Sequence, residues 1–260
     1  MIQRIHHVAA VVRDLASGYA VWRDALGLPV LREVELSDQG VRAALLAAGS
    51  CEVELVEPVR SDTGVARFLD SRGEGLHHLC FESDDVERDL ERLAATDVTL
   101  IDARPRPGLA GRIAFLHPRS CAGVLVELAT PAEPVRLPVT PATLEVVHVA
   151  VESVHETAAG YQNLFGLVPG PAPPGESVVQ LRLGRVVVQL AAQSRTHGRS
   201  GLAALGLSAP DLTDLHDRLA RHGVPVETIA GGLVLPPAAT HGVPLIFRRA
   251  EASTDTPARA

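Results

Sequence analysis

The sequence predicts an α+β fold built from four βαβββ units, two in each half of the 260-residue chain. The first observation is a pattern of one apolar strand, one amphipathic helix and three further strands, which occurs at the N-terminus and again from Leu76. The second observation is that the same pattern returns after a Pro-rich stretch near the middle of the chain. We therefore expect an internal duplication.

The first unit begins with a strand over residues 5–12, after which Asp14 is expected to cap a helix. Apolar side chains then recur at helical spacing until Gly27, which ends the helix. These side chains are Leu15, Tyr19, Trp22 and Leu26. Strand-like runs follow, separated by turn residues, at residues 28–36, 41–49 and 51–58.

The other units repeat this order. The second unit begins at Leu76, its helix is capped at Asp84 or Asp85, and its later strands lie near residues 112–115 and 124–128. The third unit opens with LEVVHVAVES and the fourth with GLAALGLSA, each followed by a helical pattern.

Two histidines and two glutamates occupy matching places in the first two units. Each histidine lies in the opening strand of its unit and each glutamate in the closing strand, and the set is His7, Glu54, His78 and Glu127. The set suits one divalent cation such as Co, Ni, Mn, Zn or Fe, because imidazoles favour the later metals and carboxylates admit earlier ones. The alternative is a group of buried polar side chains that pair only with one another.

The second half lacks a complete set. His148 and Gln189 match the first two positions, but Ala204 and Ile246 stand at the other two. Because two ligands do not make a site, this half is expected to be a degenerate copy that serves packing or shapes the cleft of the first.

The Pro-rich stretch PAEPVRLPVTPA predicts a linker between the halves. We divide the chain into a metal-binding domain at residues 1–131, a linker at 132–143, a degenerate domain at 144–250 and a tail at 251–260 that is expected to be disordered. The two domains are expected to pack as a pseudo-dimer within one chain, and a homodimer of chains is also possible.

Composition limits the classes of partner and of reaction that the protein can have. The net charge is −7 and the arginines form no basic run, so we expect a small-molecule partner and no nucleic acid. No leader pattern or membrane-spanning run is apparent, so we expect a cytoplasmic protein without a membrane partner. The absence of lysine excludes a Schiff-base lysine and a P-loop lysine. The isolated cysteines predict buried thiols, at Cys51, Cys80 and Cys121.

The chain resembles the vicinal oxygen chelate superfamily, which includes glyoxalase I, extradiol dioxygenases, bleomycin-resistance proteins and methylmalonyl-CoA epimerase. The segments IHHVAAVVRDL, FLDSRGEGLHHLCFESDDVE and IAFLHPRSCAGVLVEL are most similar to the epimerase branch, across residues 4–130. The resemblance implies two domains with curved mixed sheets, the four ligands named above and Glu127 as one acid/base carboxylate. It also implies enolate-type proton transfer on an acyl thioester or a related chelating oxoacid.

One position departs from the epimerase pattern. The resemblance implies a second acid/base glutamate after the QGV turn, where this sequence has Ala43. If residues 38–39 form a two-residue turn, Ala43 pairs with Val34. Strand alternation then sends the ionisable neighbours to the opposite face, namely Glu33, Glu35 and Arg42. Epimerisation is in doubt, because inversion requires proton removal on one face and delivery on the other.

Other polar residues are candidates for lesser roles. Four arginines could meet the phosphates of coenzyme A or of a carrier-protein pantetheine, or lie solvated at the surface: Arg104, Arg106, Arg112 and Arg119. His6 and His77 neighbour the ligands and are expected to point away from them by strand alternation. His117 is expected either to line the cleft or to cap a turn.

The sequence favours a metal-dependent enzyme of the isomerase or epimerase type. One alternative is an Fe(II) ring-cleaving dioxygenase, suggested by the two-domain length. The other is a non-catalytic protein that binds an antibiotic or another small molecule.

Overall fold

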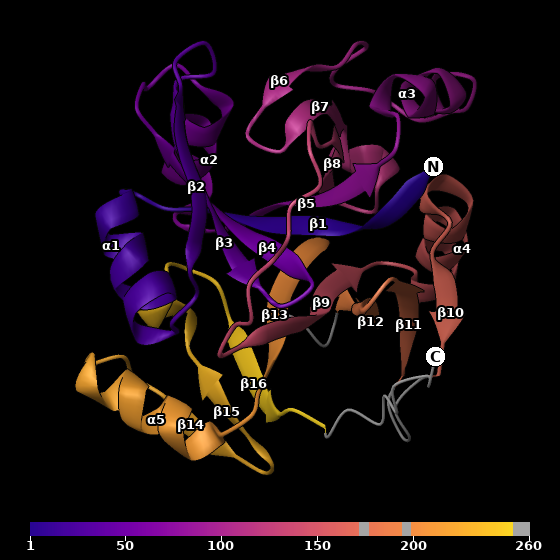
Figure 1. The fold of residues 1–260 in the computed structure, drawn as a ribbon. Coiled ribbons are helices and arrows are strands. Elements are labelled where there is room, and N and C mark those ends of the chain that lie inside the picture. Colours follow the sequence, from indigo (N-terminus) through magenta and orange to yellow (C-terminus); the bar gives the residue numbers. More distant parts are fainter. Residues whose placement is uncertain (172–176, 194–198, 252–260) are drawn as a thin grey trace, which may run out of the picture.

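The computed structural model describes residues 1–171, 177–193 and 199–251, and it contains two eight-stranded mixed sheets (Figure 1). The first sheet has the order β2-β3-β4-β1-β5-β8-β7-β6, and the second has the order β10-β11-β12-β9-β13-β16-β15-β14. The two orders are identical after a shift of eight strands. The predicted α+β class and its four βαβββ units are therefore confirmed. The expected tail, apart from its first residue, lies outside the described residues.

The strands of the first sheet are β1 (Ile2–Val11), β2 (Val30–Leu36), β3 (Val41–Ala48), β4 (Cys51–Pro58), β5 (Gly75–Ser83), β6 (Arg106–Gly108), β7 (Gly111–Leu116) and β8 (Leu125–Thr130). Those of the second are β9 (Thr143–Val151), β10 (Val168–Gly170), β11 (Val178–Leu183), β12 (Val186–Ala192), β13 (Gly201–Ala209), β14 (Glu227–Ile229), β15 (Gly232–Leu235) and β16 (Leu245–Arg249). The Pro-rich stretch before β9 forms neither helix nor strand.

The main helices are α1 (Leu15–Tyr19), which continues as the π-helical η1 (Ala20–Ala25), α2 (Gly64–Arg72), α3 (Val86–Ala94), α4 (Val154–Phe165) and α5 (Leu212–Arg221). Two 3₁₀ turns, η2 (Pro118–Ser120) and η4 (Pro237–Ala239), precede the last strand of each half. The predicted caps at Asp14 and Asp85 are confirmed, since each carboxylate accepts a backbone N–H in the first turn. Gly27 has a positive φ of 75°, as its predicted role as helix stop requires.

Helix α2 was not expected. It follows β4 and is capped by Thr63, whose Oγ1 accepts from the N–H of Ala66 at 2.9 Å. Gly73 ends it with a φ of 76°. The helix adds a wall beside β4 and β1, and it supplies several residues to the site described below.

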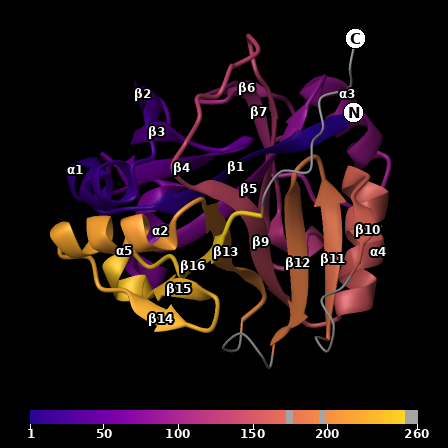
Figure 2. The same cartoon turned by 60° about the horizontal axis from the view of Figure 1, so that its bottom comes forward.

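The two halves pack through their central strands, β5 and β13 (Figure 2). Phe81 stacks on Phe165 with ring centroids 4.7 Å apart, and the Tyr161 hydroxyl donates to the carbonyl of Cys121 at 3.0 Å. One apolar core includes residues of both halves. The expected packing of the second half against the first is therefore present.

Matching glycines mark a pseudo-twofold relation between the halves. Strands β5 and β13 begin at Gly75 and Gly201, with φ values of 152° and 134°. A Cβ at Gly75 would lie 3.3 Å from the carbonyl oxygen of Gly242, and a Cβ at Gly201 would lie 3.2 Å from that of Gly123. Each half thus places a strand start against the turn before the last strand of the other.

Residues 1–132 expressed alone should aggregate or form a new homodimer, because removal of the second half exposes Phe81 and its apolar neighbours. Size-exclusion chromatography with light scattering would measure the mass of the particle. A soluble monomeric fragment with full metal binding would contradict the expectation.

Candidate metal centre

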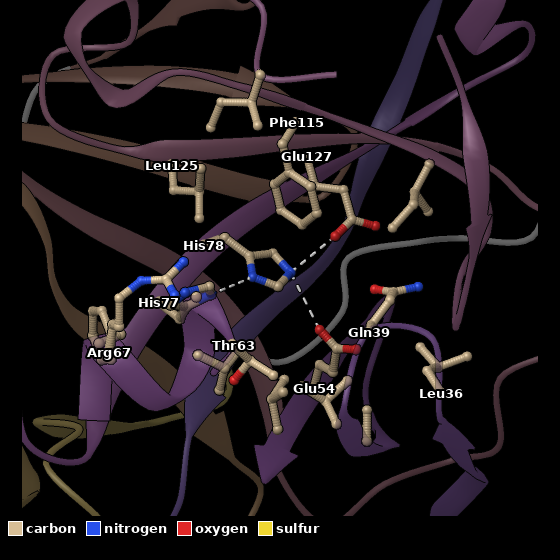
Figure 3. Close-up of a pocket in the computed structure, with 18 of the residues that line it drawn as sticks. Leu36, Gln39, Glu54, Thr63, Arg67, His77, His78, Phe115, Leu125 and Glu127 are labelled. Atoms are coloured by element: carbon tan, nitrogen blue, oxygen red, sulfur yellow. Dashed lines mark hydrogen bonds and ion pairs between the residues drawn. The ribbon is translucent and has the colours of Figure 1, made fainter. Parts of the chain in front are cut away.

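The four predicted ligands come together on one face of the first sheet. Figure 3 shows three of them, Glu54, His78 and Glu127. The Nε2 atom of His78 lies 3.1 Å from Nε2 of His7, 3.2 Å from Oε2 of Glu54 and 3.1 Å from Oε2 of Glu127. The Nε2 atom of His7 lies 3.3 Å from Oε2 of Glu54. All four side chains are buried.

Strand order and register produce this convergence. The ligands lie on β4, β1, β5 and β8, which are adjacent at the centre of the sheet. Ala9 pairs with both Glu54 and His78, and Cys80 pairs with both His7 and Glu127. Because paired residues and residues two apart share a face, all of these side chains point the same way.

Three of the side chains, His7, Glu54 and His78, form a group whose donor atoms lie close enough together to hold one metal ion. Ligand atoms about 2.1 Å from a single ion lie about 3.0 Å apart at right angles and about 3.4 Å apart at the tetrahedral angle. Four of the separations between donor atoms, 3.1 to 3.3 Å, fall in this interval. The separation of 4.0 Å between His7 and Glu127 approaches that of ligands on opposite sides of the ion.

The expectation that His6 and His77 point away from the ligands is wrong. The Nδ1 atom of His6 lies 2.9 Å from Nδ1 of His7, and His77 makes the same contact with His78. Both residues occupy β-bulges, since the pairing between β1 and β5 shifts register at each of them. A bulge interrupts alternation and brings the ring beside its neighbour instead of sending it to the other face.

The contacts define a proton arrangement for the histidine rings. A histidine that binds a cation through Nε2 carries its proton on Nδ1, so with a bound cation His7 and His78 would donate from Nδ1 and the bulge histidines would accept. Burial, followed by the neighbouring ligand ring, lowers the pKa of His77 to about 3 and that of His6 well below its ordinary value. Both therefore stay neutral and retain the lone pair that this arrangement needs.

Without a cation, a proton holds the glutamates together. Burial opposes a charge on His78, but its hydrogen bonds to Glu127 and Glu54 outweigh burial and raise its pKa to about 9. The pKa of Glu54 is lowered despite burial, because His7 and His78 favour its ionised form.

A cavity of about 600 Å³ opens over the ligands. His77, His78, Glu54 and Glu127 line it, together with Phe115 of β7 and residues of α2. The residues of α2 that sequence reasoning missed are Gly64, Val65, Arg67, Phe68, Ser71 and Arg72. The cap at Thr63 and the glycine after the helix are the signals that would have located them.

Of the four predicted arginines, Arg106 alone lines the cavity. Its guanidinium lies 5.6 Å from the ring centroid of Phe115, and its buried Nη1 has no hydrogen-bond partner within the described part of the chain. The other three are exposed: Arg104, Arg112 and Arg119. Arg119 donates to Thr99 at 2.8 Å.

His117 caps a turn and does not line the cavity. Its Nδ1 accepts from the N–H of Arg119 at 3.1 Å at the start of η2. The capping alternative of the two sequence interpretations is therefore confirmed.

The predicted register at Ala43 is confirmed. Ala43 pairs with Val34 on one side and with Val56 on the other. Its ionisable neighbours are engaged elsewhere: Glu33 accepts from the Tyr19 hydroxyl at 2.6 Å, and Arg42 contacts Glu57 at 2.8 Å. Ala43 is itself buried and lines the cavity.

The assignment of His148 as the counterpart of His7 is wrong. His148 pairs with Ala204 and Gln189 in the way that Ala9 pairs with His78 and Glu54. The true counterpart of His7 is Val146, two residues earlier. Residues two apart in a strand share a face, so the apolar pattern did not distinguish the two positions.

A family model described as glyoxalase/bleomycin resistance protein/dioxygenase superfamily matches residues 6–115. Mitochondrial methylmalonyl-CoA epimerase from Mus musculus is 35% identical over 127 residues, which are 48% of this chain and 71% of that protein. The chain belongs to this superfamily. Ethylmalonyl-CoA/methylmalonyl-CoA epimerase from Cereibacter sphaeroides is 33% identical over 131 residues, covering 49% of this chain and 98% of that superfamily member.

Solved structures that are similar to this chain include two kinds. A methylmalonyl-CoA epimerase variant from Streptomyces coelicolor, in complex with 2-nitronate-propionyl-CoA, is 35% identical with a TM-score of 0.50 and covers 51% of this chain and all of that one. A mutant 4-hydroxymandelate synthase from the same organism has a TM-score of 0.72 at 17% identity, covering 97% of this chain and 96% of that one. The second likeness shows the two-domain fold alone.

Across the three described segments, no helix is both long and apolar enough to cross a membrane.

The purified protein should hold about one divalent metal ion per chain. His78→Ala should weaken metal binding at least about tenfold, because it removes the donor nearest to all the others. His148→Ala, at the position that matches Ala9, should retain the metal. Elemental analysis after dialysis against equal free metal would measure both, and loss of metal from His148→Ala alone would contradict the assignment.

Metal binding should release about one proton per chain near neutral pH. His78 is protonated below its pKa of about 9 in the metal-free protein, and it loses this proton when Nε2 binds a cation. Affinity should therefore rise about tenfold per pH unit up to about pH 9. Calorimetry in buffers of different ionisation enthalpy would count the protons. Affinity that stays constant across this range, without proton release, would contradict the expectation.

Proposed function

We propose that this protein is a metal-dependent enzyme of the isomerase or epimerase type, which transfers a proton at the carbon between two oxygen-bearing groups of an acyl thioester or a related oxoacid. The observation that carries the proposal is the convergence of four side chains, three of which line the cavity: Glu54, His78 and Glu127. The fourth, His7, lies beside them with Nε2 3.1 Å from Nε2 of His78. Support also comes from relatives of this half, whose structures hold 2-nitronate-propionyl-CoA or methylmalonyl-CoA.

The four side chains would hold one divalent cation, either Co, Ni, Mn, Zn or Fe. When bound, such an ion would act as a Lewis acid and stabilise the negative charge that develops on the substrate oxygens when the carbon between them loses a proton. The chain supplies the orientation: the bulge histidines fix the ligand rings, and the apolar cavity walls exclude water that would weaken these electrostatic interactions.

Glu127 is the proposed proton carrier. It lies on β8 beside the cavity, with Oε2 3.1 Å from Nε2 of His78. Across the cavity, β3 presents Ala43 and no carboxylate. Glu127 would therefore serve one face of the reacting carbon as a base and permit hydrogen exchange with solvent, and the other face lacks the carboxylate of β3 that the resemblance to the epimerases implies.

Arginines at the cavity would bind the phosphates of a coenzyme A or carrier-protein thioester. Arg106 has an unpartnered buried Nη1, and Arg67 and Arg72 line the same cavity from α2. Guanidinium groups bind phosphate oxygens in bidentate fashion, so these three side chains suit a phosphate-bearing acyl group.

The natural protein should exchange the α-proton of methylmalonyl-CoA but invert its configuration slowly or not at all. Ala43→Glu should raise the inversion rate about a hundredfold, which is the contribution of a placed acid or base. Exchange in deuterium oxide followed by mass spectrometry, with a chiral assay for inversion, would measure both rates.

Glu127→Gln is the matched control and should abolish both exchange and inversion. Its metal content must be measured alongside, because Glu127 is also a proposed ligand. Efficient inversion by the natural protein, unchanged in Ala43→Glu, would show that another group serves the second face. Binding of thioesters without exchange would instead indicate a non-catalytic binding protein.

A further inference from the structure

We infer that the recess beside Ala43 binds an apolar substituent on the reacting carbon, and that this substituent is an alkyl or aryl group larger than methyl. The inference rests on the proposed function, since it concerns the substrate of the same site. It concerns specificity and not the chemical step. The residues that decide it lie on β3, next to the strand that carries Glu54.

The position of the recess follows from strand register. Leu45 of β3 lies directly opposite Glu54 of β4, and Ala43 lies opposite Val56. Ala43 is thus displaced from Leu45 by two residues, about 7 Å along the strand, on the same face as Glu54. It borders the cavity within reach of a ligand held beside that carboxylate.

The walls of the recess are apolar. They form a small buried cluster that is separate from the main core and consists of Ala9, Val41, Ala43, Leu45, Val56 and Leu109. Four of these residues line the cavity directly: Val41, Ala43, Val56 and Leu109. The cluster is therefore a cavity wall as well as protein interior, and a ligand can reach it.

Two polar side chains that border the cavity already form hydrogen bonds within the protein. Gln39 donates from Nε2 to the carbonyl of Pro107 at 3.0 Å, and Thr63 accepts from the N–H of Ala66 at 2.9 Å. A polar substituent in the recess would lose its hydration without gaining a partner from the apolar walls, which is unfavourable. An apolar substituent would gain the free energy of leaving water, about fourfold in affinity for each methylene group.

The recess and the proton carrier lie on opposite sides of the ligand cluster. Figure 3 shows Glu54 and Glu127 on opposite sides of His78. In the sheet, β1 and β5 separate the strands that carry the two glutamates. A substrate bound at the cluster would direct its substituent toward Ala43 when it directs its C–H bond toward Glu127. A glutamate at position 43 would occupy the space that a substituent larger than methyl takes.

The test uses the full-length, metal-loaded protein and a series of 2-substituted malonyl-CoA thioesters with methyl, ethyl, propyl, butyl and carboxymethyl groups. Calorimetry would give the dissociation constants, and deuterium incorporation would give kcat/KM for exchange. Affinity should rise about fourfold per added methylene until the recess is full. The carboxymethyl compound should bind no better than the methyl compound.

Ala43→Leu should reverse this order by filling the recess. Propyl and butyl compounds should lose at least about tenfold in affinity, with the methyl compound changed by less than about threefold. Ile101→Phe, at an exposed position of the cavity, is the control and should affect all compounds alike. If Ala43→Leu does not fold, the order of thioester affinities in the natural protein still tests whether the recess binds a large apolar substituent.

Two failures are distinguishable. Binding and exchange of methylmalonyl-CoA with affinity that falls as the substituent grows would overturn the inference and leave the proposed function intact. An absence of binding and exchange for every thioester, with metal present, would overturn both.

Discussion

Two buried glutamates on one face of one sheet are the constraint around which the first half is organised. Glu54 and Glu127 are nearly without solvent contact, and an isolated buried carboxylate costs several kcal/mol. A positive charge between them is therefore required, from a cation or from a proton on His78. Central strands from both units meet at this point, so neither unit could complete the cluster by itself.

The residues around the cluster are arranged so that they do not repel a positive charge at its centre. The bulges at His6 and His77 give each ligand ring an acceptor on its outer side, where regular alternation would leave none. Low pKa values keep these two rings neutral, so they add no charge that would repel a cation. The cavity is asymmetric as well: beyond Glu54, the side formed by β3 presents apolar side chains, among them Val41 and Ala43. Chemistry and specificity are thereby assigned to different strands.

Much of this could be predicted from sequence. The repeated units, the helix caps and the pairing of Ala43 with Val34 follow from local periodicity and turn chemistry, which act over a few residues. The bulges at His6 and His77 could not be predicted in this way, because one extra residue in a strand leaves no compositional trace. The match of His148 with His7 was wrong by two residues for a related reason, since a two-residue period does not fix register. Helix α2 is short and lies where the repeated unit has no helix, so the repeat itself concealed it.

The glycine contacts between the halves have a consequence for how the molecule assembles. A dimer of separate domains dissociates on dilution, whereas two domains joined by one chain meet at an effective concentration set by the linker, on the order of millimolar for a short one. The first half therefore keeps its partner at any protein concentration. The second half meets the first at two such places, where Gly242 lies against Gly75 and Gly201 lies against Gly123, and it shares one apolar core with it. The lack of ligands at Ala204 and Ile246 leaves these contacts intact.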